Sequence, residues 1–201
     1  MRVGLFGGSF DPPHRGHLAV AEAVRDSFAL DRVLLAPAAV QPLKLDGAHA
    51  SFADRLRMVE LLCEGAPGIE ASTIDGPQKD RAPNYTIDTL HRLRDELPPG
   101  TEIFVIVGAD AVLGLRQWKD PAALLKQARW IVVSRPGFDL HALETLQLTP
   151  EQLARIETLS DFENPVSATE IRERFHDHDT ASALVPPKVL EYIRAHHLYG
   201  T

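Results

Sequence analysis

The chain has 201 residues, of which 44% are hydrophobic and 24% charged, a composition typical of one soluble globular domain. The formal net charge of −7 argues against a nucleic-acid-binding surface, although a few local cations would be enough to bind a small phosphorylated ligand. No apolar run is long enough to cross a membrane, the first residues do not resemble a signal peptide, and the single cysteine, Cys63, cannot form an internal disulfide. We therefore expect one domain over residues 1–201, located in the cytoplasm.

Short apolar runs alternate with helical periodicity along most of the chain, which is typical of a parallel α/β sheet. Helices are expected from about Gly16, over residues 51–63, and after Thr86, which can act as a helix cap. The pattern is looser beyond residue 138, where helices are expected to begin at Pro150, at Ser167 and at Pro186-Pro187. Strands are predicted at residues 3–6, 33–36, 69–74, 103–107 and 130–133.

The continuously apolar run 103–107 is typical of a central strand that is covered on both faces. Trp130 lies within a predicted strand and is expected in the core. Together the elements indicate an α/β fold, a Rossmann-like doubly wound parallel sheet with C-terminal helices.

The loop after the first strand has the features of a phosphate site. Gly7 and Gly8 let the backbone approach a ligand closely, and the helix that follows offers free N–H groups at its N-terminus. The loop matches neither the P-loop pattern nor G-x-G-x-x-G, which disfavours a P-loop NTPase and a dinucleotide-dependent dehydrogenase. A glycine pair that only forms a turn remains the structural alternative.

His14 and His17 distinguish this loop, since residues three apart at a helix start project to the same side. Imidazoles in this position can donate hydrogen bonds to phosphate oxygens, and near neutral pH they could carry partial charge. The pair could instead bind a metal, but zinc sites normally recruit further ligands and none is obvious nearby.

Two separated stretches carry a family resemblance. Residues 7–17, Gly-Gly-Ser-Phe-Asp-Pro-Pro-His-Arg-Gly-His, resemble the signature of the H-x-G-H nucleotidyltransferase superfamily. Residues 166–172, Val-Ser-Ala-Thr-Glu-Ile-Arg, resemble its second element, with Ala168 in place of the usual serine. Two motifs in the expected order are far more specific than either alone.

The resemblance extends over nearly the whole chain to the bacterial nicotinate-nucleotide adenylyltransferases. Matching stretches lie at residues 55–61, 84–90, 108–110 with Trp118, 185–193 and 198–200. It implies adenylyl transfer from ATP to nicotinate mononucleotide, which gives nicotinate adenine dinucleotide and pyrophosphate in NAD biosynthesis. Nicotinamide mononucleotide or pantetheine phosphate as the acceptor, and a non-catalytic nucleotide-binding regulator, are the alternatives. The expected partners are ATP and nicotinate mononucleotide, with a homo-oligomer compatible with the sequence.

The resemblance also implies which residues act. Mg²⁺ is expected to arrive with ATP and to be held largely by phosphates and water, with no metal ligands assigned in the protein. Implied catalytic residues are His14, His17 and Arg172; ATP-binding residues are Gly7, Gly8, Ser9, Phe10, Lys44, Gly108, Asp110, Ser167 and Thr169; residues that bind nicotinate mononucleotide are Tyr85, Thr86 and Trp118.

Several of these residues have structural alternatives. Ser167 could simply cap its helix. Asp110, expected at the end of a strand, could cap the helix that follows that strand. Lys44 could be a solvated loop lysine, since Leu43 stands where the family usually has a histidine. A lone tryptophan such as Trp118 is most often a core residue.

Overall fold

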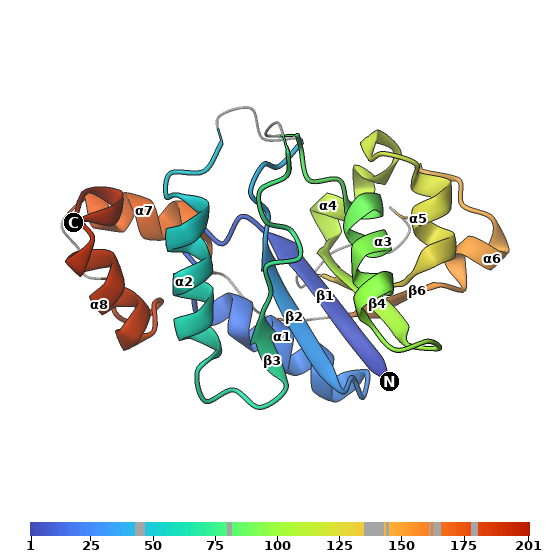
Figure 1. The fold of residues 1–201 in the computed structure, drawn as a ribbon, viewed down its shortest axis with the longest axis horizontal. Coiled ribbons are helices and arrows are strands. Elements are labelled where there is room, and N and C mark those ends of the chain that lie inside the picture. The colour runs from blue at the N-terminus through green and yellow to red at the C-terminus, as the bar shows by residue number, and fades with distance from the viewer. Residues whose placement is uncertain are drawn as a thin grey trace.

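The computed structural model describes residues 1–42, 47–79, 82–134, 143, 145–160, 162, 166–177 and 181–201. Its centre is a sheet of strand order β3-β2-β1-β4-β5-β6, in which every neighbouring pair is parallel. This order reverses direction between β1 and β4, so the predicted doubly wound α/β fold is confirmed (Figure 1). The strands are β1 (Arg2–Gly8), β2 (Arg32–Pro37), β3 (Ile69–Ala71), β4 (Glu102–Gly108), β5 (Arg129–Val133) and β6 (Ile156–Leu159).

Two strands differ from the prediction. β3 ends at Ala71, short of the expected residue 74, because the chain turns over residues 73–76: the Gly76 amide donates to the Thr73 carbonyl oxygen at 2.8 Å and the Ile74 amide donates to the Ser72 hydroxyl. β6 was not predicted. All four of its residues are only partly buried, as is common for an edge strand, so it lacks the continuous apolar run that identified β4 and β5.

The helices mostly begin where the sequence indicates, with Ser51 and Ser167 each accepting a hydrogen bond at a helix start. Thr86 is not the cap of α3, since the N-cap is Tyr85 and its side chain makes no capping bond. The unpredicted α5 is capped by Asp120 with Pro121 first in the helix. The helices are α1 (Arg15–Ser27), α2 (Phe52–Cys63), α3 (Thr86–Glu96), α4 (Ala109–Leu113), α5 (Pro121–Gln127), α6 (Pro150–Leu153), α7 (Ala168–His176) and α8 (Pro187–Ala195), with 3-10 turns η2 (Leu115–Gln117) and η4 (Leu198–Gly200).

Each face of the sheet carries its own apolar core. The cluster on one face joins strand residues such as Val105 to α3, α4 and α5, and contains Trp130, which is fully buried as expected. The other joins alternate strand residues such as Phe104 to α1, α2, α7 and α8. Figure 1 shows α7, α8 and the C-terminus at one end of the molecule and α5 and α6 at the other.

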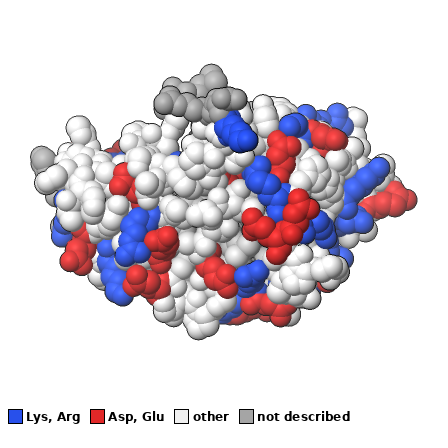
Figure 2. Space-filling view, viewed as in Figure 1, with Lys and Arg blue, Asp and Glu red and all other residues white. Residues whose placement is uncertain are grey.

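The single cysteine and the distribution of charged side chains are in line with the composition. Burial raises the pKa of Cys63, at the end of α2, to about 12, which indicates an unreactive thiol. Acidic and basic side chains are interspersed on the face seen in Figure 2. In the described part of the chain, no helix is long and apolar enough to cross a membrane.

Candidate active site

Two cavities meet over the carboxyl ends of β1 and β4, the edge of a doubly wound sheet where ligands bind. The histidine cavity, of about 850 Å³, contains His14 and His17 together with the start of α7. The tryptophan cavity, of about 510 Å³, contains Trp118 and the start of α3. Both are lined by the same central residues, Phe6, Gly7, Gly8, Ser9, Val107 and Gly108.

Glycines leave the junction of the cavities open. A Cβ atom added at Gly7 or Gly108 would meet nothing within 4 Å, so a ligand can approach the backbone of both strand ends. A Cβ at Gly8 would instead lie 3.2 Å from the ring of Phe10, which is buried and packs on the His17 ring with centroids 4.8 Å apart. Gly7 and Gly108 therefore face open space, whereas Gly8 accommodates Phe10.

His14 and His17 lie together in the histidine cavity, as their spacing predicts. Their rings stack with centroids 3.7 Å apart. The backbone N–H of His14, the N-cap of α1, donates a 3.2 Å hydrogen bond to Nδ1 of His17. Because Nδ1 accepts, a neutral His17 carries its proton on Nε2 and can donate it to a ligand in the cavity.

Both histidines are neutral near pH 7 in the free protein, so the expected partial charge is wrong for this state. Burial lowers the pKa of His14 to about 4. Burial, and secondly the proximity of His14, hold the pKa of His17 well below its usual value. The two rings therefore offer an incoming anion neutral hydrogen-bond donors rather than fixed positive charge.

The start of α7 forms the opposite wall of the histidine cavity. The Ser167 hydroxyl accepts a 3.1 Å hydrogen bond from the Glu170 amide, so it does act as a cap. Arg172 donates to the Thr169 hydroxyl at 3.2 Å and to the Asp11 carbonyl oxygen at 2.7 Å. This last bond joins two segments 161 positions apart and brings both predicted motifs into one site.

Asp11 anchors the first loop, a role that sequence reasoning missed. Its carboxylate accepts hydrogen bonds from the amides of His49 at 2.7 Å and Ala50 at 3.0 Å, and from the Tyr199 hydroxyl at 2.8 Å. Burial alone would raise the pKa of Asp11, but these hydrogen bonds outweigh it and hold the pKa below its usual value. Asp11 is therefore a structural anion whose oxygens are already engaged.

Arg55 is a second residue that the sequence reasoning left without a role. It is 1% exposed and donates to the carbonyl oxygens of Ser9 at 2.6 Å, Ala38 at 3.0 Å and Ala50 at 3.2 Å. A signal was present, since Arg55 falls on the same helical face as the buried residues Met58, Val59 and Leu62. An arginine on an apolar face needs buried partners, and here they are the loops around the site.

The tryptophan cavity contains the other group of predicted residues. Tyr85 and Thr86 lie at the uncapped N-terminus of α3, and Trp118 is partly buried against Trp130, with ring centroids 5.7 Å apart. Trp118 thus packs on the core and lines the cavity at once. Asp110 lies in this cavity, not in the histidine cavity, because β4 ends at Gly108 and Asp110 is exposed in the first turn of α4.

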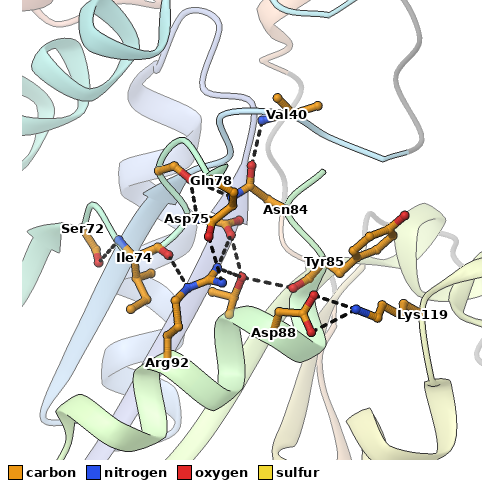
Figure 3. Close-up of polar contacts among 12 residues, drawn as sticks. Val40, Ser72, Ile74, Asp75, Gln78, Asn84, Tyr85, Asp88, Arg92 and Lys119 are labelled. Atoms are coloured by element: carbon orange, nitrogen blue, oxygen red, sulfur yellow. Dashed lines mark hydrogen bonds and ion pairs between the residues drawn. The ribbon is translucent and has the colours of Figure 1, made fainter. Parts of the chain in front are cut away.

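A polar network behind the tryptophan cavity holds the start of α3 (Figure 3). Asn84 accepts from the Val40 amide and donates to the Gly76 carbonyl oxygen, each at 2.9 Å. The Thr89 hydroxyl donates to Asp75 at 2.6 Å, and the Arg92 guanidinium lies 3.6 Å from the same carboxylate.

Burial is the largest influence on Asp75 and raises its pKa, although Thr89 and Arg92 oppose it. Lys44 falls outside the described residues. Among the described residues, no group of three or more side chains suited to metal binding lies close together.

The comparisons with known proteins agree with this geometry. The family model for cytidylyltransferase-like proteins matches residues 5–174. The chain is 39% identical to a "Probable nicotinate-nucleotide adenylyltransferase" of Solibacter usitatus over the full length of both proteins. It is 40% identical to one of Gloeobacter violaceus, covering 98% of this chain and 96% of that protein.

A solved structure has the same fold. The Plasmodium falciparum nicotinic acid mononucleotide adenylyltransferase complexed with NaAD superposes with a TM-score of 0.74 over 98% of this chain and 97% of that chain, at 17% identity. This structural match shows the fold, and the full-length relatives together with the family model show the descent. The chain belongs to the cytidylyltransferase-like family and, within it, to the nicotinate-nucleotide adenylyltransferases.

Proposed function

We propose that this chain transfers the adenylyl group of ATP to nicotinate mononucleotide, giving nicotinate adenine dinucleotide and pyrophosphate, a step of NAD biosynthesis. The observation that carries the proposal is the pair of cavities joined at Gly7, Gly8 and Gly108. Such a site can bring two phosphorylated compounds together with their phosphates at the shared junction. The names of the full-length relatives support the same reaction.

The chemistry asks little of the protein beyond alignment and charge stabilisation. An oxygen of the acceptor's phosphate attacks the α-phosphorus of ATP, the bond from that phosphorus to the bridging oxygen breaks, and pyrophosphate leaves with the electron pair. The attacking phosphate is already ionised, so no general base is needed. Catalysis then comes from holding the reactants in line and stabilising the negative charge that spreads over the phosphoryl oxygens.

The histidine cavity suits the triphosphate. His17 would donate its Nε2 proton to the α-phosphate, with His14 beside it. Ser167 and Thr169 would place the N-terminus of α7 against the β- and γ-phosphates, and Arg172 would add a fixed positive charge. Ser9 and Phe10 complete the loop around the phosphates.

The tryptophan cavity suits the pyridine nucleotide. Trp118 would stack on the pyridine ring, and the backbone amides near Tyr85 and Thr86 would receive its carboxylate. Asp110 lines the same cavity with an exposed carboxylate, so on this side of the junction it would accept hydrogen bonds from a ribose hydroxyl.

Mg²⁺ would enter with ATP as part of the substrate. Asp11 lines the histidine cavity, but its oxygens already accept hydrogen bonds, and no set of carboxylates among the described lining residues could enclose a cation. A Mg²⁺ ion held mainly by the substrate phosphates and water would fit this lining, because Mg²⁺ retains much of its hydration, and it would supply positive charge to the phosphates.

The test is a comparison of acceptors. Purified protein is supplied with ATP, Mg²⁺ and either nicotinate mononucleotide, nicotinamide mononucleotide or pantetheine phosphate, and pyrophosphate release is followed. We expect the highest kcat/KM with nicotinate mononucleotide. A clear preference for either other acceptor would overturn the acceptor assignment, and tight ATP binding without pyrophosphate release for any acceptor would indicate a regulator.

A further inference from the structure

Lys119 is the single lysine or arginine among the described residues that line the tryptophan cavity. Its Nζ donates to both carboxylate oxygens of Asp88, at 2.8 and 3.1 Å, and lies 4.8 Å from the centre of the Tyr85 ring (Figure 3). The lysine follows Trp118 directly in the chain. A cation is therefore held beside the cavity wall where the pyridine ring would stack.

The negative charge of Asp88 explains why a cation is needed if an anion is to bind at the start of α3. Asp88 lies in the first turn of α3, whose N-terminus has no side-chain cap, so that amides at the start of this helix are available to an anionic ligand. A negative side chain in that turn repels an anionic ligand at the same place. Lys119 neutralises Asp88 and restores the positive character of this helix end.

The Lys119–Asp88 pair contributes little to folding. The two side chains are 49% and 39% exposed, and an ion pair that is hydrated to this degree adds little stability. The chain around Lys119 is nevertheless well fixed. Trp118 ends η2 in an extended conformation, and Asp120 adopts a left-handed φ of 50° to cap α5. The ammonium group of Lys119 is thus held beside the cavity by Asp88 and the Tyr85 ring, although it is not needed to hold the fold.

We propose that Lys119, with Asp88 as its counter-ion, selects the acid form of the pyridine nucleotide over the amide form. The two forms differ by one negative charge on the ring substituent, and the Lys119–Asp88 pair controls the charge of the wall that faces this substituent. The inference rests on the proposed function, and it adds the specificity-determining residue.

A competing role for Lys119 makes a different prediction. The lysine could instead bind the phosphate of the acceptor. That phosphate is common to both forms, so loss of the lysine would then weaken both reactions equally. Recognition of the carboxylate affects mainly the acid, so the ratio of the two kcat/KM values separates the roles.

The experiment measures kcat/KM for nicotinate mononucleotide and nicotinamide mononucleotide at saturating ATP. For Lys119→Met, which keeps an unbranched apolar stem, we expect kcat/KM for the acid to fall about tenfold, as for loss of one charge-assisted contact, with a much smaller change for the amide. Lys119→Arg should keep the preference. Lys126→Met, which removes an exposed lysine in α5 outside the cavity, is the matched control and should match the wild type.

A double variant tests the part played by Asp88. In Asp88→Asn/Lys119→Met the repelling carboxylate is also removed, so kcat/KM for the acid should recover part of the loss seen in Lys119→Met. Melting temperatures close to the wild type in all variants exclude unfolding as the cause.

The outcomes separate this inference from the proposed function. A wild-type protein without preference for the acid would overturn both. A wild-type preference that Lys119→Met leaves unchanged, or an equal loss with both acceptors, would overturn the role of Lys119 alone.

Discussion

The two cavities are built from the same strand ends but are held in different ways. The walls of the histidine cavity are fixed by buried polar groups that join distant segments: Asp11 contacts the C-terminal Tyr199, and Arg55 contacts three loop carbonyl oxygens. The tryptophan cavity also has buried support in Asn84 and Asp75, but the groups nearest the ligand space, such as Lys119, are partly exposed.

This difference matches what each cavity would have to do in the proposed reaction. Transfer of an adenylyl group requires the triphosphate to be aligned closely, and in the histidine cavity, where we propose that it binds, buried hydrogen bonds between distant segments suit that demand. Choice of an acceptor requires only a difference in affinity between similar molecules, which a hydrated charge pair can provide. Changes in the histidine cavity should therefore affect turnover and stability, and changes in the tryptophan cavity should affect selectivity.

The largest expected effect is that of His17→Ala. The substitution removes the ring that accepts from the His14 amide and, with it, the proposed donor to the α-phosphate. We expect kcat to fall on the order of 10²–10³-fold, as for loss of one donor to a transition-state oxyanion, with acceptor selectivity unchanged. Steady-state kinetics with both pyridine mononucleotides measures this, and circular dichroism checks that the fold survives. Near-normal turnover would show that His17 has no phosphate role.

The next effect is on the pH dependence of stability. The pKa of His14 is about 4 in the folded chain against 6.5 for an ordinary histidine, so between these values the unfolded chain binds more protons. The stabilisation is complete above pH 6.5 and is lost as the pH falls toward 4, a decrease of about 3 kcal/mol in the free energy of unfolding. His17, with its lowered pKa, contributes in the same direction.

Urea unfolding at a series of pH values measures this decrease. His14→Gln, which keeps a polar side chain without a titrating ring, should flatten the dependence between these two values. An unchanged slope in His14→Gln would mean that His14 is not the group responsible. Trp118→Ala is a useful comparison, because it alters the other cavity and should leave the slope as it is in the wild type.

The sequence predicted the features of the two cavities that depend on neighbouring residues better than those that depend on long-range contacts. The strand β4, the stacked pair His14 and His17 and the capped start of α7 depend on neighbouring residues, and their patterns are readable. The contacts of Asp11 with Tyr199 and of Arg172 with Asp11 join residues 188 and 161 positions apart, and no local pattern encodes them.

The assignment of Asp110 shows a second limit. The sequence indicated that Asp110 follows the central strand. Asp110 is the second residue of α4, and this position in the first helical turn directs it into the tryptophan cavity. Which of two adjoining cavities a residue lines depends on the conformation of one turn. Patterns of hydrophobicity do not report on such a detail, because exposed residues in a short helix follow no apolar period.

Trp118→Ala tests whether the tryptophan cavity binds the acceptor rather than ATP. Loss of the ring removes the proposed stacking surface for the pyridine, so we expect KM for nicotinate mononucleotide to rise about tenfold, as for loss of one base-stacking aromatic side chain, while KM for ATP changes little. Trp118 also packs on Trp130, and Trp118→Phe keeps much of that packing and should restore most of the affinity. Equal increases in both KM values would indicate damage to the core instead.

The smallest expected effect is that of Tyr199→Phe, which tests whether the C-terminal turn η4 helps to hold the first loop of the histidine cavity. Tyr199→Phe removes the hydroxyl that donates to Asp11 and leaves the carboxylate with its bonds from His49 and Ala50. The free energy of unfolding should fall by about 1 kcal/mol, and kcat should decrease slightly because the loop that carries His14 is held less firmly. The ratio of kcat/KM between acid and amide acceptors should not change.

Tyr192→Phe is the matched control for this prediction, since the Tyr192 hydroxyl also donates to an aspartate, Asp54, at 2.9 Å. Asp54 is more exposed than Asp11, and water can replace the lost donor, so the cost should be smaller and kcat should be unaffected. An equal loss of stability in the two variants would show that the burial of Asp11 does not strengthen its bond. A change in acceptor ratio for Tyr199→Phe would mean that the two cavities are not held independently.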